Sequence, residues 1–220
     1  MKTLHKEIAT YNLNVNRKGN GERIRLFSLF VLLLLIFSTN LSFAHCDTMD
    51  GPVIKDARNA FEQSNVNYVL KWINHESEAE VKEAFNLAMN VRKLGPEAKI
   101  LAEKYFFETL VRLHRSGEGV PYTGVKPSGT PVDEKILAAD KSIEAGNLSL
   151  LKNKVPKEIL PELSERFNKV MALKTFDVNN VEAGREYIEA YVLFFKFAEG
   201  EEGFDKNKDP GNNPHSGHIH

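Results

Sequence analysis

The segment PEAKILAEKYFFETLVRLHRS, residues 96–116, has the strongest helical pattern in this 220-residue chain. Its apolar residues return every three or four positions, the spacing that places side chains on one face of an α-helix. Proline suits the first turn of such a helix, and the glycines at 117 and 119 suit its end. The segment therefore predicts one long amphipathic helix, whose apolar side is expected to hold Leu101, Tyr105, Phe106, Leu110 and Leu113.

Three further long helices are indicated by the same spacing and by residues typical of helix boundaries. Ser77 and Glu80 form the S-x-x-E pattern of a capping box, Gly95 ends the helix that follows, and Asn180 is suited to cap the last long helix. Short connections join the first two and the last two helices, which favours two antiparallel hairpins packed together. The long helices are expected at 77–94, 96–116, 156–174 and 181–199.

Shorter helical segments are expected before and between these four, and no segment stands out with the alternating pattern of a β-strand. Asp50 is a candidate N-cap for the first short helix, with Pro52 in its first turn. Residues 117–131 are rich in glycine and proline and are expected to form one long loop. We therefore predict an all-α fold, with a four-helix-bundle-like core and additional short helices.

Large apolar side chains on these predicted helices are expected to form the core, because their burial drives folding. Those expected in or near the core are Trp72, Phe85, Phe106, Phe107, Leu110, Phe167, Tyr187, Tyr191 and Phe194.

The N-terminal region has the order of a secretory signal peptide. Arg23 and Arg25 precede an uncharged apolar block at 26–37, and small residues follow at Ser42 and Ala44. The alternative is an uncleaved membrane anchor, although the block is shorter than the about 20 residues that a spanning helix needs. We expect a protein exported to the periplasm or the medium, without stable membrane insertion after cleavage near Ala44. The expected parts are a signal peptide at 1–44, a helical domain at 45–199 and a disordered, histidine-containing tail at 200–220.

The charge distribution argues against a nucleic-acid partner. The chain has a net charge of −1, and residues 1–44 contribute +4, from six basic and two acidic residues. The remainder, with 23 basic and 28 acidic residues, carries −5 and lacks the clustered positive charge that phosphate binding needs. Sequence patterns for nucleotide binding, serine hydrolysis and zinc proteolysis do not occur.

Cleavage after Ala44 would leave His45 at the new amino terminus, followed by Cys46, the only cysteine of the chain. The amine and the imidazole Nδ1 of a first-position histidine can chelate one metal ion, and a thiol stands next to them. Asp47 and Asp50 add carboxylate oxygens within five residues. Imidazole and thiolate suit copper, zinc, nickel or iron, whereas carboxylates alone would suit magnesium or calcium. These four residues are therefore candidate ligands of a transition metal ion.

This part of the chain resembles the metal-binding hook of the nickel superoxide dismutases, which has the pattern H-C-D-x-x-C-G. His45, Cys46, Asp47 and Gly51 match it in order and spacing, but Asp50 stands at the position of the second cysteine. The resemblance implies a helical bundle and nickel ligation by the terminal amine, the imidazole, and the amide and thiolate of Cys46. In that family, thiolate donation lowers the redox potential of the nickel ion. A carboxylate at position 50 is a poor substitute for the second thiolate.

A longer resemblance is to a family of uncharacterised bacterial secreted proteins. It rests on AHCDTMDGP at 44–52, VRKLGPEAK at 91–99, YFFETLVRLHR at 105–115 and NNVEAGREY at 179–187. This resemblance implies a shared fold and a shared site, without an established activity.

His114, near the end of the 96–116 segment, is a further candidate ligand. One interpretation is a histidine at the edge of the core, stabilised by the dipole at the helix C-terminus. The other is a metal-binding or catalytic role. Glu118 follows four residues later, but Gly117 leaves its direction open. Three histidines at 215–220 could also bind metal from a flexible tail.

The leading hypothesis is an exported helical protein that binds copper, nickel or zinc through His45 and Cys46. Asp47 or Asp50 would add a carboxylate, and His114 a ligand from the helical domain. Such a site could support an oxidoreduction such as superoxide dismutation, or it could serve a metal carrier. The alternative is a non-enzymatic binding or structural module, in which Cys46 is buried or pairs with another chain. Oligomerisation is open in both cases.

Overall fold

The computed structural model describes residues 45–200, and all regular secondary structure among them is helical. Two 3₁₀ turns, His75–Ser77 and Lys157–Ile159, precede the helices α4 and α8. The all-α prediction is confirmed for these residues. The helices are α2 (Pro52–Gln63), α3 (Asn67–Leu70), α4 (Glu78–Val91), α5 (Pro96–Gly117), α6 (Glu134–Ala145), α7 (Ser149–Lys152), α8 (Leu160–Leu173) and α9 (Val181–Glu199).

The predicted signal peptide at 1–44 lies outside the described residues, as does the predicted tail beyond Gly200. Within 45–200, no helix combines the length and the apolar character that crossing a membrane requires.

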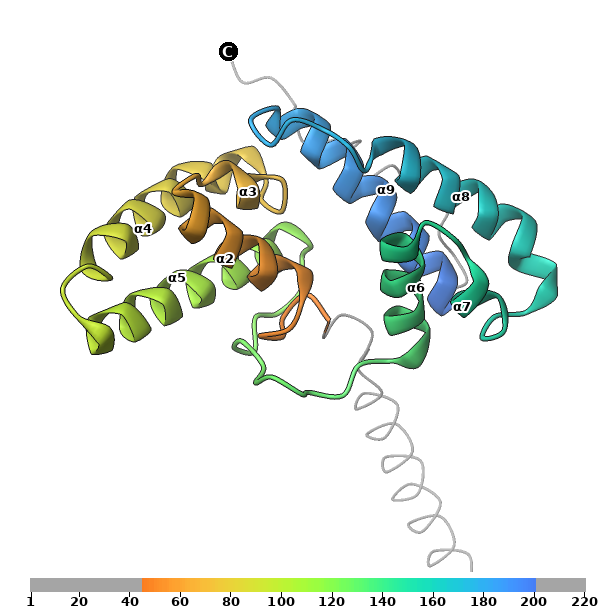
Figure 1. Ribbon diagram of the computed structural model, residues 1–220, viewed down its shortest axis with the longest axis horizontal. Coiled ribbons are helices and arrows are strands. Elements are labelled where there is room, and N and C mark those ends of the chain that lie inside the picture. Colours follow the sequence, from red (N-terminus) through yellow and green to blue (C-terminus); the bar gives the residue numbers. More distant parts are fainter. Residues whose placement is uncertain (1–44, 201–220) are drawn as a thin grey trace, which may run out of the picture. The chain divides into compact units, whose positions relative to one another are not determined.

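Both predicted hairpins are present. Helices α4 and α5 lie side by side, joined by a turn in which Gly95 has a φ of 149°, a conformation that favours glycine (Figure 1). Helices α8 and α9 form the second pair (Figure 1). The shorter helix α2 packs on α5, and α6 packs on α9. Each hairpin therefore buries part of its apolar surface against a shorter third helix.

The buried face of α5 differs from the expected one. Leu101 and Tyr105 are 67% and 47% exposed, whereas Ala102, Phe106 and Leu110 are buried. Successive residues of a helix are about 100° apart, so a face centred on Ala102 and Phe106 turns Leu101 and Tyr105 to its border. The expectation that Leu101 and Tyr105 line the apolar side was wrong, because the periodic pattern allowed two neighbouring faces.

Aromatic rings fill the core of each hairpin. The ring centroid of Phe61 lies 5.5 Å from that of Phe85 and 5.1 Å from that of Phe106, between α2, α4 and α5. Phe167 and Phe194 meet at 5.8 Å between α8 and α9. Full burial of one such side chain contributes about 1.5–3 kcal/mol to folding. All the predicted core residues are buried except Tyr187, which is partly buried and packs against the core.

Helix capping was predicted correctly at one of three positions. Asn180 accepts a hydrogen bond from the backbone nitrogen of Ala183 at 3.1 Å and caps α9. The capping box at Ser77 is not formed, because the side chain of Asn74 instead accepts from the backbone nitrogen of Ser77. Gly51, not Asp50, occupies the N-cap position of α2.

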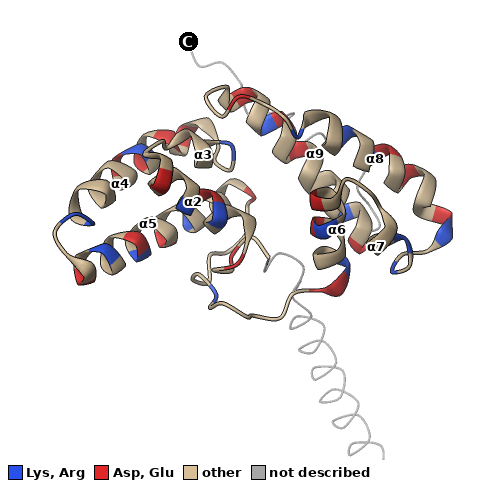
Figure 2. Ribbon diagram, in the orientation of Figure 1, with Lys and Arg blue, Asp and Glu red and all other residues tan. Residues whose placement is uncertain are grey.

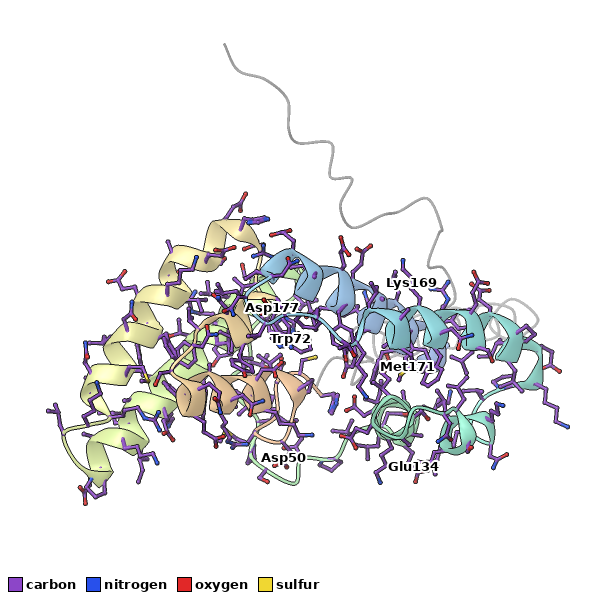
Figure 3. The ribbon with its side chains drawn as sticks, turned by 45° about the horizontal axis from the view of Figure 1, so that its top comes forward. Asp50, Trp72, Glu134, Lys169, Met171 and Asp177 are labelled. Atoms are coloured by element: carbon purple, nitrogen blue, oxygen red, sulfur yellow. The ribbon has the colours of Figure 1, made fainter. Side chains whose placement is uncertain are left out.

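The start of α9 is fixed against the segment around α3. A Cβ at Gly184 would lie 3.0 Å from the Cβ of Lys71, a tight contact, so glycine at residue 184 lets the two segments approach without displacing Lys71. Arg185 donates to the carbonyl of Ile73 at 3.1 Å and pairs with Glu78 at 2.6 Å. Trp72 lies in this region (Figure 3). Its ring is perpendicular to that of Tyr191 on α9, with the ring centroids 6.0 Å apart.

Acidic and basic side chains are interspersed along the four long helices (Figure 2). Some are spaced to pair along one helix, as in Glu78–Lys82 at 2.6 Å and Glu162–Arg166 at 2.7 Å. Exposed pairs at this spacing contribute about 0.3–0.5 kcal/mol each. The helical surfaces therefore present charges of both signs.

Candidate functional site

The segment that begins at His45 pairs with the long loop between α5 and α6. The backbone nitrogen of Lys126 donates to the carbonyl of Asp47 at 2.7 Å, and that of Met49 donates to the carbonyl of Lys126 at 2.9 Å. The carboxylate of Asp50 accepts from the hydroxyl of Ser128 at 2.7 Å and from the nitrogen of Gly129 at 2.8 Å (Figure 3). The segment at 45–50 and the loop expected at 117–131 therefore meet in space and hold each other in place.

A tight turn folds His45 back over Gly51. The carbonyl of His45 accepts from the hydroxyl of Thr48 at 3.1 Å, and the carbonyl of Thr48 accepts from the nitrogen of Gly51 at 3.0 Å. A Cβ at position 51 would lie only 2.1 Å from the His45 carbonyl oxygen. Any larger residue would displace the turn, so the glycine before Pro52 has a structural reason that is independent of metal binding.

His45 is 8% exposed and has a different environment at each ring nitrogen. Its Nε2 is hydrogen-bonded to Asp140 of α6. An ionised carboxylate can only accept, so Nε2 must carry the hydrogen. Its Nδ1 is buried without a hydrogen-bond partner, and the ring is stacked with that of Phe195 at 6.4 Å. The lone pair of a neutral His45 therefore lies at Nδ1.

Cys46 borders a cavity of about 40 Å³, together with His45, Glu118 and side chains of α6 and α9. Most of those side chains are apolar or aromatic, but the charged Lys196 and Glu199 of α9 line the cavity as well. Burial raises the pKa of the Cys46 thiol well above its ordinary value, and the nearby carboxylates of Glu118, Asp47 and Asp140 raise it further. The sulfur is therefore a protonated thiol at neutral pH unless a cation replaces the proton.

His114 is 4% exposed near the end of α5. Its Nδ1 lies 3.0 Å from the carbonyl oxygen of Trp72, which can only accept, so Nδ1 carries the hydrogen. Its Nε2 has no hydrogen-bond partner, and the nearest carboxylate oxygen, Oε1 of Glu118, is 3.6 Å away. The helix continues through Gly117 to Glu118 at its C-cap, so Glu118 lies on the same face as His114.

Charged side chains connect Asp47 to the face of α5 that carries His114 and Glu118. Arg115 lies 3.4 Å from Oδ2 of the buried Asp47 and donates to Oε2 of Glu118 at 2.9 Å. Burial raises the pKa of Asp47 to about 6, although the charge of Arg115 opposes the rise. Asp47 is therefore held by Arg115, while Glu118 stands between Arg115 and His114.

The structure thus brings His45, Cys46 and His114 into the surroundings of one carboxylate, Glu118. Asp47 lies beside this group, whereas Asp50 is exposed, hydrogen-bonded to the loop, and does not line the cavity. In the part of the chain that the structure describes, no three His, Cys, Asp or Glu side chains already converge as a metal-binding group.

The sequence analysis left the direction of Glu118 open, did not name Asp140, and placed Tyr191 only in the core. The four-residue spacing from His114 is a signal for Glu118, because it places both side chains on one helical face. Asp140 and Tyr191 come from α6 and α9, and neither has a local pattern that connects it with His45.

Residues 50–197 match a family of unknown function, DUF6448. No curated protein matches the chain. No solved structure matches it either. The match covers most of the chain, beginning at Asp50 and ending within α9. The chain therefore belongs to this family of unknown function, DUF6448.

Proposed function

We propose that this protein is an exported metal-binding protein whose processed N-terminal pair, His45 and Cys46, binds a transition metal ion. Cleavage after Ala44 would free the amine of His45. One observation carries the proposal: the imidazole of His45 directs Nε2–H at Asp140 and leaves the buried Nδ1 without a partner.

This orientation is the one that metal ligation by Nδ1 needs. A histidine that binds metal through one nitrogen almost always donates the hydrogen of its other nitrogen to a carboxylate, a carbonyl or water. The carboxylate fixes the ring and makes the ligating nitrogen more basic. Nδ1 is also the ring nitrogen that can close a six-membered chelate with the terminal amine. His114 repeats the arrangement, with a backbone carbonyl at Nδ1 and an unpartnered Nε2.

The donors fit a transition metal. His45 would supply its amine and Nδ1, Cys46 its sulfur, Glu118 a carboxylate and His114 its Nε2. Nitrogen and sulfur donors with one carboxylate suit copper, nickel or zinc. Because no such group is assembled within residues 45–200, binding requires side-chain rotation, and the freed amine adds a donor that the uncleaved chain lacks. A bound ion with an open position would supply a Lewis acid or, for copper and nickel, a one-electron couple.

The surroundings of Cys46 favour a cation. The negative charges of Glu118, Asp47 and Asp140 all raise the pKa of the Cys46 thiol, and only the positive charge of Arg115 lowers it. A metal ion that replaces the thiol proton would be stabilised by the same negative charge. The second thiolate of the nickel hook has no counterpart, since Asp50 is engaged by Ser128 and Gly129.

The test begins with the protein recovered from the medium or periplasm of a producing cell. Mass spectrometry should give His45 as the first residue. Metal analysis should give close to one equivalent of copper, nickel or zinc after saturation. The variants His45→Ala and Cys46→Ser should lose most of it, and His75→Ala, which alters an exposed histidine outside the cavity, should not. A metal content below about 0.1 equivalent in the wild-type protein would contradict the proposal.

Turnover is a separate claim. If the bound metal is a redox centre, the metal-loaded wild type should consume superoxide faster than the His45→Ala variant that has been exposed to the same metal. A metal carrier would give equal rates while still releasing its ion to a stronger chelator.

A second candidate is a secreted binding or structural module with a structural Cys46. It is favoured by the contacts of Asp47, Thr48, Asp50 and Gly51, which all hold the segment in place without a metal. In that case Cys46→Ser and His45→Ala would lower stability, and none of the variants would differ in metal content.

A further inference from the structure

Tyr191 of α9 makes a hydrogen bond that extends from His45 into the helical core. Its hydroxyl donates to Oδ1 of Asp140 at 2.7 Å, and Oδ2 of the same carboxylate accepts from Nε2 of His45. One carboxylate thus uses a different oxygen for each partner. The three residues come from α9, α6 and the N-terminal segment.

Tyr191 is rigidly placed, whereas the carboxylate alone is not. The tyrosine is 5% exposed, and its ring lies 4.3 Å from that of Phe195 and 6.0 Å from that of Trp72. The side chain of Asp140 is 21% exposed and reaches water, so its terminal torsion is soft without a second anchor. The hydroxyl of Tyr191 supplies that anchor.

From this geometry we infer that Tyr191 is a positioning residue, which acts through Asp140 to hold His45 as the Nε2–H tautomer with its lone pair at Nδ1. The inference deepens the proposed function, because Nδ1 is the nitrogen that would chelate metal with the amine. It also stands apart from that function, since the tautomer exists whether or not metal binds.

The first measurement is the tautomer of His45 in the metal-free protein, read from the ¹⁵N shifts of its two ring nitrogens above pH 8. The wild type should carry its hydrogen on Nε2. Tyr191→Phe keeps the ring and removes only the hydroxyl, and it should produce a mixture of the two tautomers. Tyr187→Phe is the matched control: its ring lies 6.1 Å from that of Tyr191, and its hydroxyl does not bond to Asp140.

A second variant makes the test independent of how well Tyr191→Phe folds. If the tyrosine hydroxyl keeps the donor role that it has towards Asp140, it will hold the amide oxygen of Asp140→Asn, so that the amide nitrogen faces His45 and can only donate. His45 must then accept at Nε2 and move its hydrogen to Nδ1. Adding Tyr191→Phe should free the amide to flip and abolish this inversion.

The outcomes separate the two claims. Loss of Nε2–H preference in Tyr191→Phe, or inversion in Asp140→Asn, supports the positioning role. A tautomer that is unchanged in both variants overturns it. If metal binds, Tyr191→Phe should lower the zinc affinity by about 10-fold, the lower end of the range for residues that orient a ligand. If the wild type binds no zinc, copper or nickel, the proposed function fails and the tautomer data still decide the role of Tyr191.

Discussion

Glu118 places Oε1 3.6 Å from Nε2 of His114, while its other carboxylate oxygen accepts a hydrogen bond from Arg115 at 2.9 Å. The carboxylate of Glu118 can reach the His114 ring because α5 continues through Gly117, which places residue 118 about one helical turn after residue 114. Glu118 also borders the cavity that holds His45 and Cys46. Among the described residues, Glu118 is therefore a carboxylate that lies near His114 and also lines the cavity of His45 and Cys46.

Replacing this carboxylate should weaken metal binding more than folding. Glu118→Gln is expected to lower the affinity for zinc or copper by about 10-fold or more, because the amide is a weak ligand and leaves the cavity less negative. Competition with a chromophoric chelator measures the change. Glu108→Gln, on the same helix but outside the cavity, should keep wild-type affinity. Equal affinities for all three proteins would exclude Glu118 from the site.

The turn that folds His45 back over Gly51 should not tolerate a side chain at position 51. Gly51→Ala puts a Cβ 2.1 Å from a backbone oxygen, which forces the segment to move. We expect a loss of about 2 kcal/mol or more in the free energy of unfolding, by analogy with strained and overpacked substitutions. Urea denaturation followed by circular dichroism measures it.

Gly117→Ala is the control for this substitution. The nearest atom to its Cβ is 3.9 Å away, and the backbone is helical. Alanine should stabilise the protein there by about 0.5 kcal/mol, because it restricts the unfolded chain. Similar losses in both variants would show that Gly51 is not special.

The contact between Arg185 and Glu78 predicts a pH dependence of stability. Hydrogen bonds from Arg185 and Lys82 lower the pKa of Glu78 to about 2, from an ordinary value of 4.5. A lowered pKa means that the folded state prefers the ionised form, so the stabilisation is fully present above pH 4.5. It is lost as the pH falls toward 2.

We expect Glu78→Gln to lower the free energy of unfolding by about 1 kcal/mol at pH 7, after allowance for solvent screening. The difference from wild type should shrink below pH 4.5 and vanish only when the pH falls below the folded-state pKa of about 2. Denaturation at several pH values provides the measurement. Glu80→Gln, which removes an exposed partner of Arg112, should change stability by a few tenths of a kcal/mol at most. A difference that persists unchanged at pH 2 would contradict the assignment.

Completing the nickel-hook pattern should not create a nickel site. Asp50→Cys restores H-C-D-x-x-C-G in the sequence, but residue 50 faces Ser128 and Gly129 of the loop. The variant should take up no more nickel than wild type. It should also be cleaved faster by protease within residues 117–131, since the loop loses its carboxylate anchor. Nickel uptake with a new thiolate absorption band would mean that the segment can leave the loop and fold as the hook does.

Local pattern was sufficient for the helices and for most of the core. The spacing of apolar residues at 77–94, 96–116, 156–174 and 181–199 predicted the helical hairpins, because helix formation depends on neighbours three and four residues apart. Gly95, Pro96 and Asn180 marked boundaries for the same local reason. The local pattern gave the wrong result where it was compatible with two arrangements. It placed Leu101 and Tyr105 on the buried face of α5, and it predicted a capping box at Ser77 that does not form.

The residues of the candidate site also fall into those that local sequence predicted and those that it did not. His45, Cys46 and His114 were predicted from their chemistry, since donor types are a property of the side chain itself. Asp140 and Tyr191 were not, because they reach His45 across 95 and 146 positions of sequence and no periodicity relates residues so far apart. The hydrogen-bonding environment of a ring nitrogen depends on which groups the packing of α6 and α9 brings beside it. The sequence therefore specified the available donors, and tertiary packing decided which atom of each donor stayed unpaired.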